Sequence, residues 1–275
     1  WTGRIAWKRP RDSDHSYSTP LLIEHYDVPQ IVSVGGRGVA SYDPVTGQEL
    51  WWCRHDGYSV VPRPVYGNAL VYICTGYNTP MLMAIDPSGS QDVTDTHVIW
   101  KAEKGVPFNP SPILVDSLLF LIGDTGVLSC YDALAGELLW QKRLRGRFSA
   151  SPLLADGRLF LTSDEGVTYV VQPGEQFELV GQCELDGLVQ ASPAVSGRSL
   201  LVRTETHLYR IEDNAGALAP QQEGSTDWPQ FRGPKGQGDA GNPGLPTSWN
   251  EETNVVWKAE IPGKGWSSPV AMGDR

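Results

Sequence analysis

Serine, histidine and aspartate, the residue types of a hydrolytic triad, occur together near the start of the chain. His15 follows Asp12, Ser13 and Asp14 in one short run. A working triad needs a nucleophile, a base and an orienting acid that the fold brings together, and neighbours in one segment do not meet that requirement. The sequence therefore predicts no catalytic residue and favours a protein that is not an enzyme.

Metal ligation finds equally little support in the sequence. The four cysteines are scattered, and none forms a Cys-x-x-Cys pair: Cys53, Cys74, Cys130 and Cys183. Cysteines of this kind are mostly buried free thiols. Asp92, Asp95 and His97 are the nearest thing to a polar cluster, and we expect them on a surface loop. The sequence thus predicts no metal site.

Charge and hydropathy exclude two further classes of partner. The net charge is −10 and the isoelectric point is about 4.9, so a phosphate backbone would be repelled. Residues 233–238 are rich in glycine, but no strand-to-helix pattern surrounds them, so they are not a phosphate loop. No apolar run approaches the ~18 residues of a membrane-spanning helix. No signal peptide is visible at Trp1.

The composition indicates the elements that must position any functional side chain. The 275 residues include 30 Gly, 21 Pro and 10 Trp, with 20% charged and 40% hydrophobic residues. Turn-forming residues at this frequency, together with large aromatic residues, are typical of many short strands joined by tight turns. We therefore expect an all-β protein.

A small residue followed by proline recurs before an apolar strand. The first five copies are spaced 40 to 48 residues apart and end at Pro20, Pro64, Pro112, Pro152 and Pro193, and a further copy ends at Pro269. In the copy at 151–183, four strand-like runs alternate with turns, of which Asp156-Gly157 is a strong hairpin signal. Four antiparallel strands per roughly 40 residues is the unit of a propeller blade. We predict a β-propeller of about five whole blades plus two partial ones.

A second motif ends the repeat units. It consists of an aspartate, a glycine four residues later and a tryptophan four residues after that. The motif and its partial copies comprise Asp43, Gly47 and Trp51, then Asp132, Gly136 and Trp140, and the tryptophans Trp100 and Trp257. The aspartate caps a turn that the glycine makes possible, and we expect the tryptophan to pack between neighbouring sheets. These residues are predicted to be structural.

With these motifs the chain resembles the PQQ-binding-like (pyrroloquinoline quinone) β-propeller repeat proteins, within the outer-membrane-assembly and quinoprotein-like propeller superfamily. Residues 227–234, 245–249 and 265–269 resemble more narrowly the secreted bacterial, planctomycete-type members. The resemblance implies a periplasmic or secreted protein. In that family the segment like 227–234 opens the chain, whereas here it follows the run at 207–211 that closes the family repeat. The family segments therefore stand in circularly displaced order.

This order divides the chain into three parts. Residues 1–212 are expected to form propeller blades, with a partial blade at 1–9, four full repeats and the inner strands of a fifth. Residues 213–253 are expected to be a Gly- and Pro-rich linker or surface excursion. Residues 254–275 should supply the outer strand of the fifth blade and the start of the next. Open blade edges in such an arrangement favour self-association.

The loops that enter the inner strands should form one face of the propeller. Aromatic residues and arginine, the types that anchor interfaces, occur on these loops. They are His15, Tyr17, Tyr58, Arg63, Phe108, Phe148 and Trp266. We predict a non-catalytic scaffold of the cell envelope that binds a protein, or a small ligand, through this entry-loop face.

The alternative is a quinone-dependent dehydrogenase of alcohols or sugars. The resemblance implies for that class a calcium ion held by carboxylate and amide oxygens, a catalytic aspartate and commonly an adjacent cysteine pair. This chain has no adjacent cysteines and no acidic cluster with calcium-loop spacing, so we expect no cofactor. Carbohydrate binding through Tyr and Trp residues of the entry loops is a third interpretation.

Overall fold

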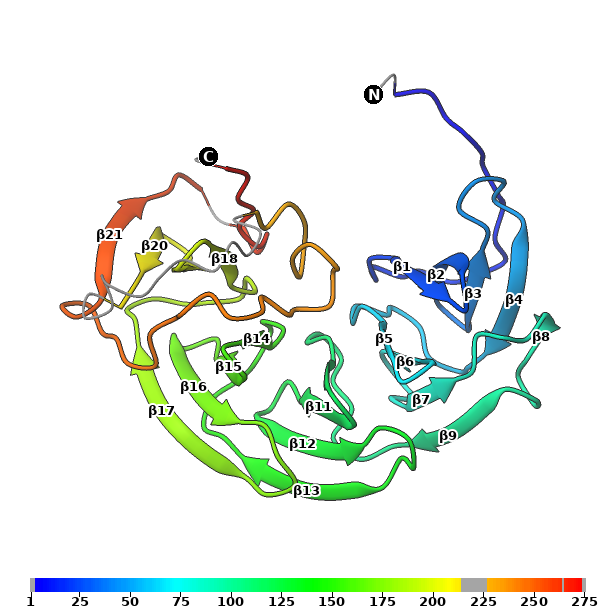
Figure 1. The fold of residues 1–275 in the computed structure, drawn as a ribbon, viewed down its shortest axis with the longest axis horizontal. Helices are drawn as coiled ribbons and strands as arrows, with labels where there is room; N and C mark the ends of the chain where they lie inside the picture. Colours follow the sequence, from blue (N-terminus) through cyan, green and yellow to red (C-terminus); the bar gives the residue numbers. More distant parts are fainter. Residues whose placement is uncertain (1–2, 214–226, 264, 274–275) are drawn as a thin grey trace.

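The computed structural model describes residues 3–213, 227–263 and 265–273, and their only regular secondary structure is β-strand. Five sheets follow one another around an arc, with the first and the last at its two ends (Figure 1). Each contains four antiparallel strands, and we number them blades 1 to 5. The prediction of an all-β propeller is confirmed. No helix in the described residues has the length and apolar character needed to cross a membrane.

The strands of each blade follow the chain from the inner to the outer edge. Blade 1 contains β1 (Leu21–His25), β2 (Val28–Gly35), β3 (Gly38–Tyr42) and β4 (Glu49–Arg54). Blade 2 contains β5 (Val65–Gly67), β6 (Leu70–Cys74), β7 (Leu82–Ile85) and β9 (Val98–Ala102). Blade 3 contains β10 (Ile113–Val115), β11 (Leu118–Ile122), β12 (Val127–Asp132) and β13 (Leu138–Arg143). Blade 4 contains β14 (Leu153–Ala155), β15 (Arg158–Thr162), β16 (Val167–Gln172) and β17 (Glu178–Glu184). Blade 5 contains β18 (Ala194–Ser196), β19 (Ser199–Arg203), β20 (His207–Ile211) and β21 (Val255–Glu260).

Four apolar clusters hold successive blades together. Each draws on both faces that meet, because the middle strands of a blade are buried on both sides. Representative pairs from blade 1 to blade 5 are Trp51 and Met83, Tyr72 and Tyr131, Phe120 and Tyr169, and Phe160 and Tyr209. In the described part of the chain no such cluster joins blade 5 to blade 1, so the blades form an open arc.

The Asp-x-x-x-Gly turn of one blade receives the tryptophan of the blade before it. The side chain of Asp132 accepts two backbone N–H bonds of its own turn, at 2.7 and 2.8 Å. Gly136 has φ +72°, and a Cβ built on it would lie 2.5 Å from the Trp100 ring. The indole of Trp100 donates to the carbonyl oxygen of Ala133 at 3.0 Å. Glycine is therefore required both for the backbone conformation and for the room it leaves.

Blade 1 has the same arrangement, with the tryptophan supplied by the segment before β1. Residues 3–9, expected as an outer strand, form no strand pairing with any described residue. Trp7 nevertheless lies over Gly47, at 2.5 Å from a Cβ built there, and its indole donates to the carbonyl oxygen of Pro44 at 3.0 Å. The turn itself is capped by Asp43. The short N-terminal segment thus supplies the tryptophan contact of a preceding blade.

Trp51 reaches the turn of blade 2 through an intermediate side chain. Its indole donates to Oε1 of Gln30 at 2.8 Å, and Nε2 of Gln30 donates to the carbonyl oxygen of Pro87 at 3.1 Å. The hydroxyl of Ser41 donates to the same Oε1 at 2.8 Å. All of these polar groups are buried, so Gln30 satisfies three hydrogen-bonding groups at once.

The insertion between β7 and β9 forms part of blade 1. Its strand β8 (Gln91–Asp92) pairs in parallel with β4, so blade 1 gains a fifth, outermost strand. Val93 is fully buried between blades 1 and 2. Asp92, expected on a surface loop, accepts hydrogen bonds from the amide and hydroxyl of Thr94. The insertion therefore covers the junction of the first two blades.

The serine of the Ser-Pro repeat connects neighbouring blades at their inner edge. The backbone amide of Arg63 donates to the hydroxyl of Ser111, that of Ser111 to Ser151, and that of Ser151 to Ser192, at 3.0, 3.0 and 2.9 Å. Arg63 occupies the serine position in blade 2. Its guanidinium instead donates to the carbonyl oxygen of Pro20 in blade 1, at 2.9 Å.

Residues 227–253 are the described part of the segment expected as a linker or surface excursion. They lie first at the inner side of the arc and then run outward between blades 4 and 5 (Figure 1). This segment lies beside the innermost strand of blade 4 and forms backbone hydrogen bonds with it. The amide of Leu154 donates to the carbonyl oxygen of Gly238, and that of Asp156 to Gly241, both at 2.8 Å. We call residues 231–241 the central plug.

The central plug is also bonded to blades 2 and 3. Three hydrogen bonds make these connections: Nη1 of Arg63 to the carbonyl oxygen of Phe231 at 2.9 Å, the amide of Tyr66 to Oε1 of Gln237 at 2.7 Å, and Nη2 of Arg232 to the carbonyl oxygen of Pro112 at 2.8 Å. A segment late in the sequence therefore joins the inner edges of three earlier blades.

Trp249, which follows the plug, completes the junction of blades 4 and 5. Gly181 holds the register position on β17 that tryptophan holds on the other outer strands. Trp249 is 3% exposed and stacks on Phe160, with centroids 6.2 Å apart. On β21 the equivalent Trp257 is 37% exposed. Trp249, from the segment after the plug, thus occupies the space that an outer-strand tryptophan would fill if blade 4 had one in place of Gly181.

Candidate binding site

Two loops of the entry-loop face meet at the junction of blades 1 and 2. One joins β4 to β5 and the other joins β6 to β7; alternating strand directions place both on the same face. A Cβ built on Gly57 would lie 1.8 Å from the carbonyl oxygen of Thr75, so the backbones are in direct contact. Tyr58 and Tyr77 exchange backbone hydrogen bonds of 3.3 and 2.8 Å. This contact fixes the two tyrosines beside each other.

Three aromatic rings form a continuous row on this face, of which Tyr58 and Tyr77 are exposed and Phe108 is partly buried. The rings of Tyr58 and Tyr77 are 5.7 Å apart and nearly perpendicular, and Tyr77 lies 5.6 Å from Phe108. Tyr58 is 38% exposed and Tyr77 is 56% exposed. We call these three residues the aromatic row. Contacting rings that remain open to solvent are the kind of surface that anchors a partner.

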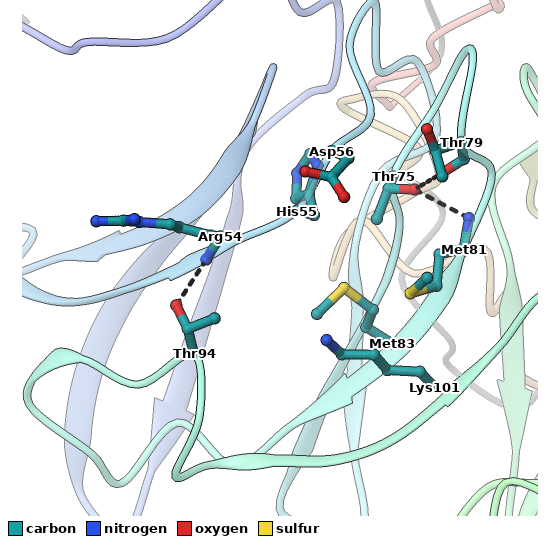
Figure 2. Close-up of a pocket in the computed structure, with 9 residues that line it drawn as sticks. All are labelled: Arg54, His55, Asp56, Thr75, Thr79, Met81, Met83, Thr94 and Lys101. Carbon is teal, nitrogen blue, oxygen red and sulfur yellow. Dashed lines mark hydrogen bonds between the residues drawn. The ribbon is translucent and has the colours of Figure 1, made fainter.

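A small cavity lies beside the aromatic row, between the same two loops. Its volume is about 210 Å³. It is lined by Arg54, His55, Asp56, Thr75, Thr79, Met81, Met83, Thr94 and Lys101 (Figure 2). Sites for drug-sized ligands occupy about 300–1,000 Å³, so this cavity suits a single side chain or a small molecule.

His55 is the uncommitted polar group of the cavity. It is 8% exposed, and neither ring nitrogen has a hydrogen-bond partner. Burial lowers the pKa of His55 to about 4, so the ring is neutral at pH 7 and has one donor and one acceptor nitrogen. The Thr75 and Thr94 hydroxyls, by contrast, are engaged with neighbouring groups.

Arg54 also lines a second cavity, which runs along the sheet of blade 1. In Figure 2 its side chain extends away from the other residues, and its guanidinium lies 4.9 Å from the centre of the Trp52 ring. The second cavity measures about 510 Å³ and is lined by residues 10–14, by the β2–β3 turn and by Tyr42, Glu49, Trp52 and Arg54. Aromatic and charged groups thus continue across the outer part of blade 1.

The structure brings together four of the seven predicted binding residues. Tyr58 and Phe108 belong to the aromatic row, and Tyr17, 69% exposed, is bonded to the same loop through the carbonyl oxygen of Val60. The carbonyl oxygen of His15 accepts a bond from the amide of Ser59, so His15 is also at this place.

The other three predicted binding residues lie elsewhere. Arg63 and Phe148 are 4% and 1% exposed, so they are not presented on the surface. Arg63 holds the central plug, and Phe148 belongs to the apolar cluster between blades 3 and 4. Trp266 is 72% exposed, but it follows β21 of blade 5 and so belongs to the other end of the arc.

Sequence reasoning did not identify Tyr77, His55 or Lys101. Tyr77 lies in a loop between the second and third strands of its blade, where the repeat has no marker residue. His55 and Lys101 come from β4–β5 and β9, and only the packing of blade 1 on blade 2 brings them to one cavity. A signal for Tyr77 was available in its type, because an aromatic residue beside Gly76 and Asn78 in a turn is not required by strand packing.

The described residues do not fit the quinone and calcium that the resemblance implies for dehydrogenases. They contain no group of three or more His, Cys, Asp and Glu side chains that would hold a metal ion. All four cysteines are buried free thiols. Burial raises the pKa of the thiol of Cys53 to about 11, so it stays protonated. No reaction step through such a cofactor follows from these residues.

Comparison with known proteins gives matches for the repeat sequence and for the fold. Residues 89–176 match the family model described as outer membrane protein assembly factor BamB, a PQQ-type repeat model. No curated protein sequence gives a significant match. The crystal structure of BamB from Moraxella catarrhalis is similar, with a TM-score of 0.58 and 16% identity over 77% of this chain. The match spans 62% of the BamB chain. This chain therefore has a β-propeller fold, and its residues 89–176 match a PQQ-type repeat.

Proposed function

We propose that this protein is a non-catalytic scaffold of the bacterial cell envelope that binds a protein partner through the aromatic row, without a quinone cofactor. The observation that carries the proposal is the contact of the exposed rings of Tyr58 and Tyr77 with each other and with the partly buried ring of Phe108 on one face. The likeness to BamB, an outer membrane protein assembly factor, supports a periplasmic location and a protein partner.

The physical basis of the proposal is the free energy gained when exposed aromatic surface is buried against a partner. A Tyr ring buried on binding removes a large apolar area from water at little cost in conformational entropy. Tyr58 and Tyr77 stand on two loops whose backbones are bonded to each other, so little ordering is needed when a partner binds. The adjacent cavity offers a recess for one side chain of that partner.

Site-specific photocrosslinking in cells that make the protein tests the proposal. A photoreactive residue replaces Tyr77, and as a control it replaces Tyr26, which is 79% exposed on the β1–β2 turn of the opposite face. We expect one discrete crosslinked protein at position 77 and none at position 26. Equal crosslinking at both positions, or none at position 77, would contradict the proposal. Titration with the quinone and calcium, read by dye reduction, should give no substrate-dependent signal.

A further inference from the structure

Two arginines are buried together at the central plug. Arg63 is 4% exposed and Arg232 is 2% exposed. Nη1 of Arg63 donates to the carbonyl oxygen of Phe231, the residue next to Arg232. A Cβ built on Gly236 would lie 2.2 Å from the guanidinium of Arg63, and one on Gly238 would lie 2.7 Å from that of Arg232. The two guanidinium groups therefore share one enclosed place, against the glycines of the plug.

The positive charge at this place has no counter-charge in the protein. In the part of the chain that the structure describes, no carboxylate oxygen lies within 4.0 Å of either guanidinium. Their hydrogen-bond acceptors are all main-chain carbonyl oxygens: those of Pro20 and Phe231 for Arg63, and those of Pro112 and Gln237 for Arg232. Buried charges in proteins are normally paired, because an isolated charge loses its hydration in the interior. The low dielectric also strengthens the repulsion between two like charges.

Three N–H groups at the same place have no acceptor. They are Nε of Arg63 and both Nε and Nη1 of Arg232, and each is inaccessible to solvent. A buried donor without a partner is costly, and a buried charged donor more so. One bound anion would accept hydrogen bonds from such donors and at the same time neutralise part of the charge.

We propose that a small inorganic anion of the halide class is bound between Arg63 and Arg232 at the central plug. A halide is spherical and accepts hydrogen bonds from any direction, which suits donors on two different side chains. The donor atoms are inaccessible to solvent, so we expect a small ion and not an organic acid such as gluconate. Bound there, the anion connects the plug to the blades. Its binding is independent of the proposed function.

Bromide crystallography gives the direct test. Crystals of the whole protein grown in sodium bromide should show an anomalous peak in contact with Nε of Arg63 and with Nε or Nη1 of Arg232. A site that contains water only, with no anomalous peak there, would overturn the proposal.

Thermal unfolding gives the test in solution. Replacing gluconate by chloride at constant ionic strength should raise the unfolding midpoint by about 2–4 °C, because the anion binds the folded state only. Arg63→Ser, which places in blade 2 the residue that blades 3 to 5 have, should abolish this response. The control Arg143→Ser, at an exposed position on β13, should keep it. A wild-type midpoint that is equal in the two salts would overturn the proposal whatever the variants do.

Discussion

The backbone amide of Ser111 donates a hydrogen bond of 3.0 Å to the hydroxyl of Ser151, which lies 40 residues later in the chain. Both residues are buried. Ser111 and Ser151 thus each accept the amide of the blade before them, and their own amides are accepted by the blade after them. The serine is therefore a connector between blades, and the proline after it, which has no N–H, begins the inner strand without losing a ladder bond.

Replacing Ser151 by alanine should lower the free energy of unfolding by about 1–3 kcal/mol, because the buried amide of Ser111 would lose its acceptor. Denaturant unfolding of the two proteins measures the difference. Ser117→Ala, at an exposed turn position, serves as the control and should change the free energy by less than about 0.5 kcal/mol. Equal stabilities of the Ser151 variant and the wild type would refute the connecting role.

Alanine substitutions at Gly136 and Gly157 distinguish the cost of backbone strain from the cost of a steric clash. Both have positive φ, +72° and +66°, but a Cβ meets the Trp100 ring only at Gly136. Gly157→Ala should therefore cost about 1 kcal/mol for backbone strain alone. Gly136→Ala should cost a further 1–3 kcal/mol or so from the collision. If the two variants unfold at the same denaturant concentration, the tryptophan does not rest on the turn as described.

Trp249 and Trp266 form a matched pair near the C-terminal end, one 3% and the other 72% exposed. Trp249→Ala should lower the free energy of unfolding by about 3–5 kcal/mol, because it leaves a cavity between blades 4 and 5. Trp266→Ala should leave it nearly unchanged. Near-ultraviolet circular dichroism during unfolding gives both values, and a larger effect at position 266 would contradict the packing.

His55 makes stability depend on pH. Its pKa is about 4 in the folded protein and 6.5 without burial, so between these values the unfolded chain binds a proton that the folded chain does not. Stability should therefore be complete above about pH 6.5 and fall by up to about 3 kcal/mol as the pH drops to 4. The difference between wild type and His55→Gln, followed by denaturant unfolding across this range, isolates the effect. A difference that does not change with pH would contradict the burial of a neutral ring.

The strand pattern of the fold could be predicted because each strand and turn is determined by residues within one repeat unit. The Asp156-Gly157 turn, the Pro152 strand start and the Trp140 strand each depend on residues within one unit, and all three lie where the pattern placed them. The prediction for 3–9 was weaker, since an outer strand needs a neighbouring strand that the sequence cannot supply locally. Trp7 keeps its packing role although its segment pairs with no described strand.

The candidate site was predicted only in part, for reasons of distance along the chain. Arg63 has the residue type of an interface anchor, yet it replaces a buried connecting serine and bonds to Phe231, 168 residues away. Nothing near Arg63 in the sequence reveals that partner. Tyr77 has no fixed place in the repeat, and it joins Tyr58 and Phe108 only because two loops pack together.

The central plug has a consequence for the order of events during synthesis. The amide of Tyr66 has no acceptor until Gln237, which follows it by 171 residues, has been synthesised. At 5–20 residues per second a ribosome needs roughly 10–30 s to make that stretch. For that time the inner edge of blade 2 exists without the segment that joins it to its neighbours, and the inner edges of blades 3 and 4 do so for shorter times. The newly made chain therefore presents unpaired strand edges to the cell first and conceals them last.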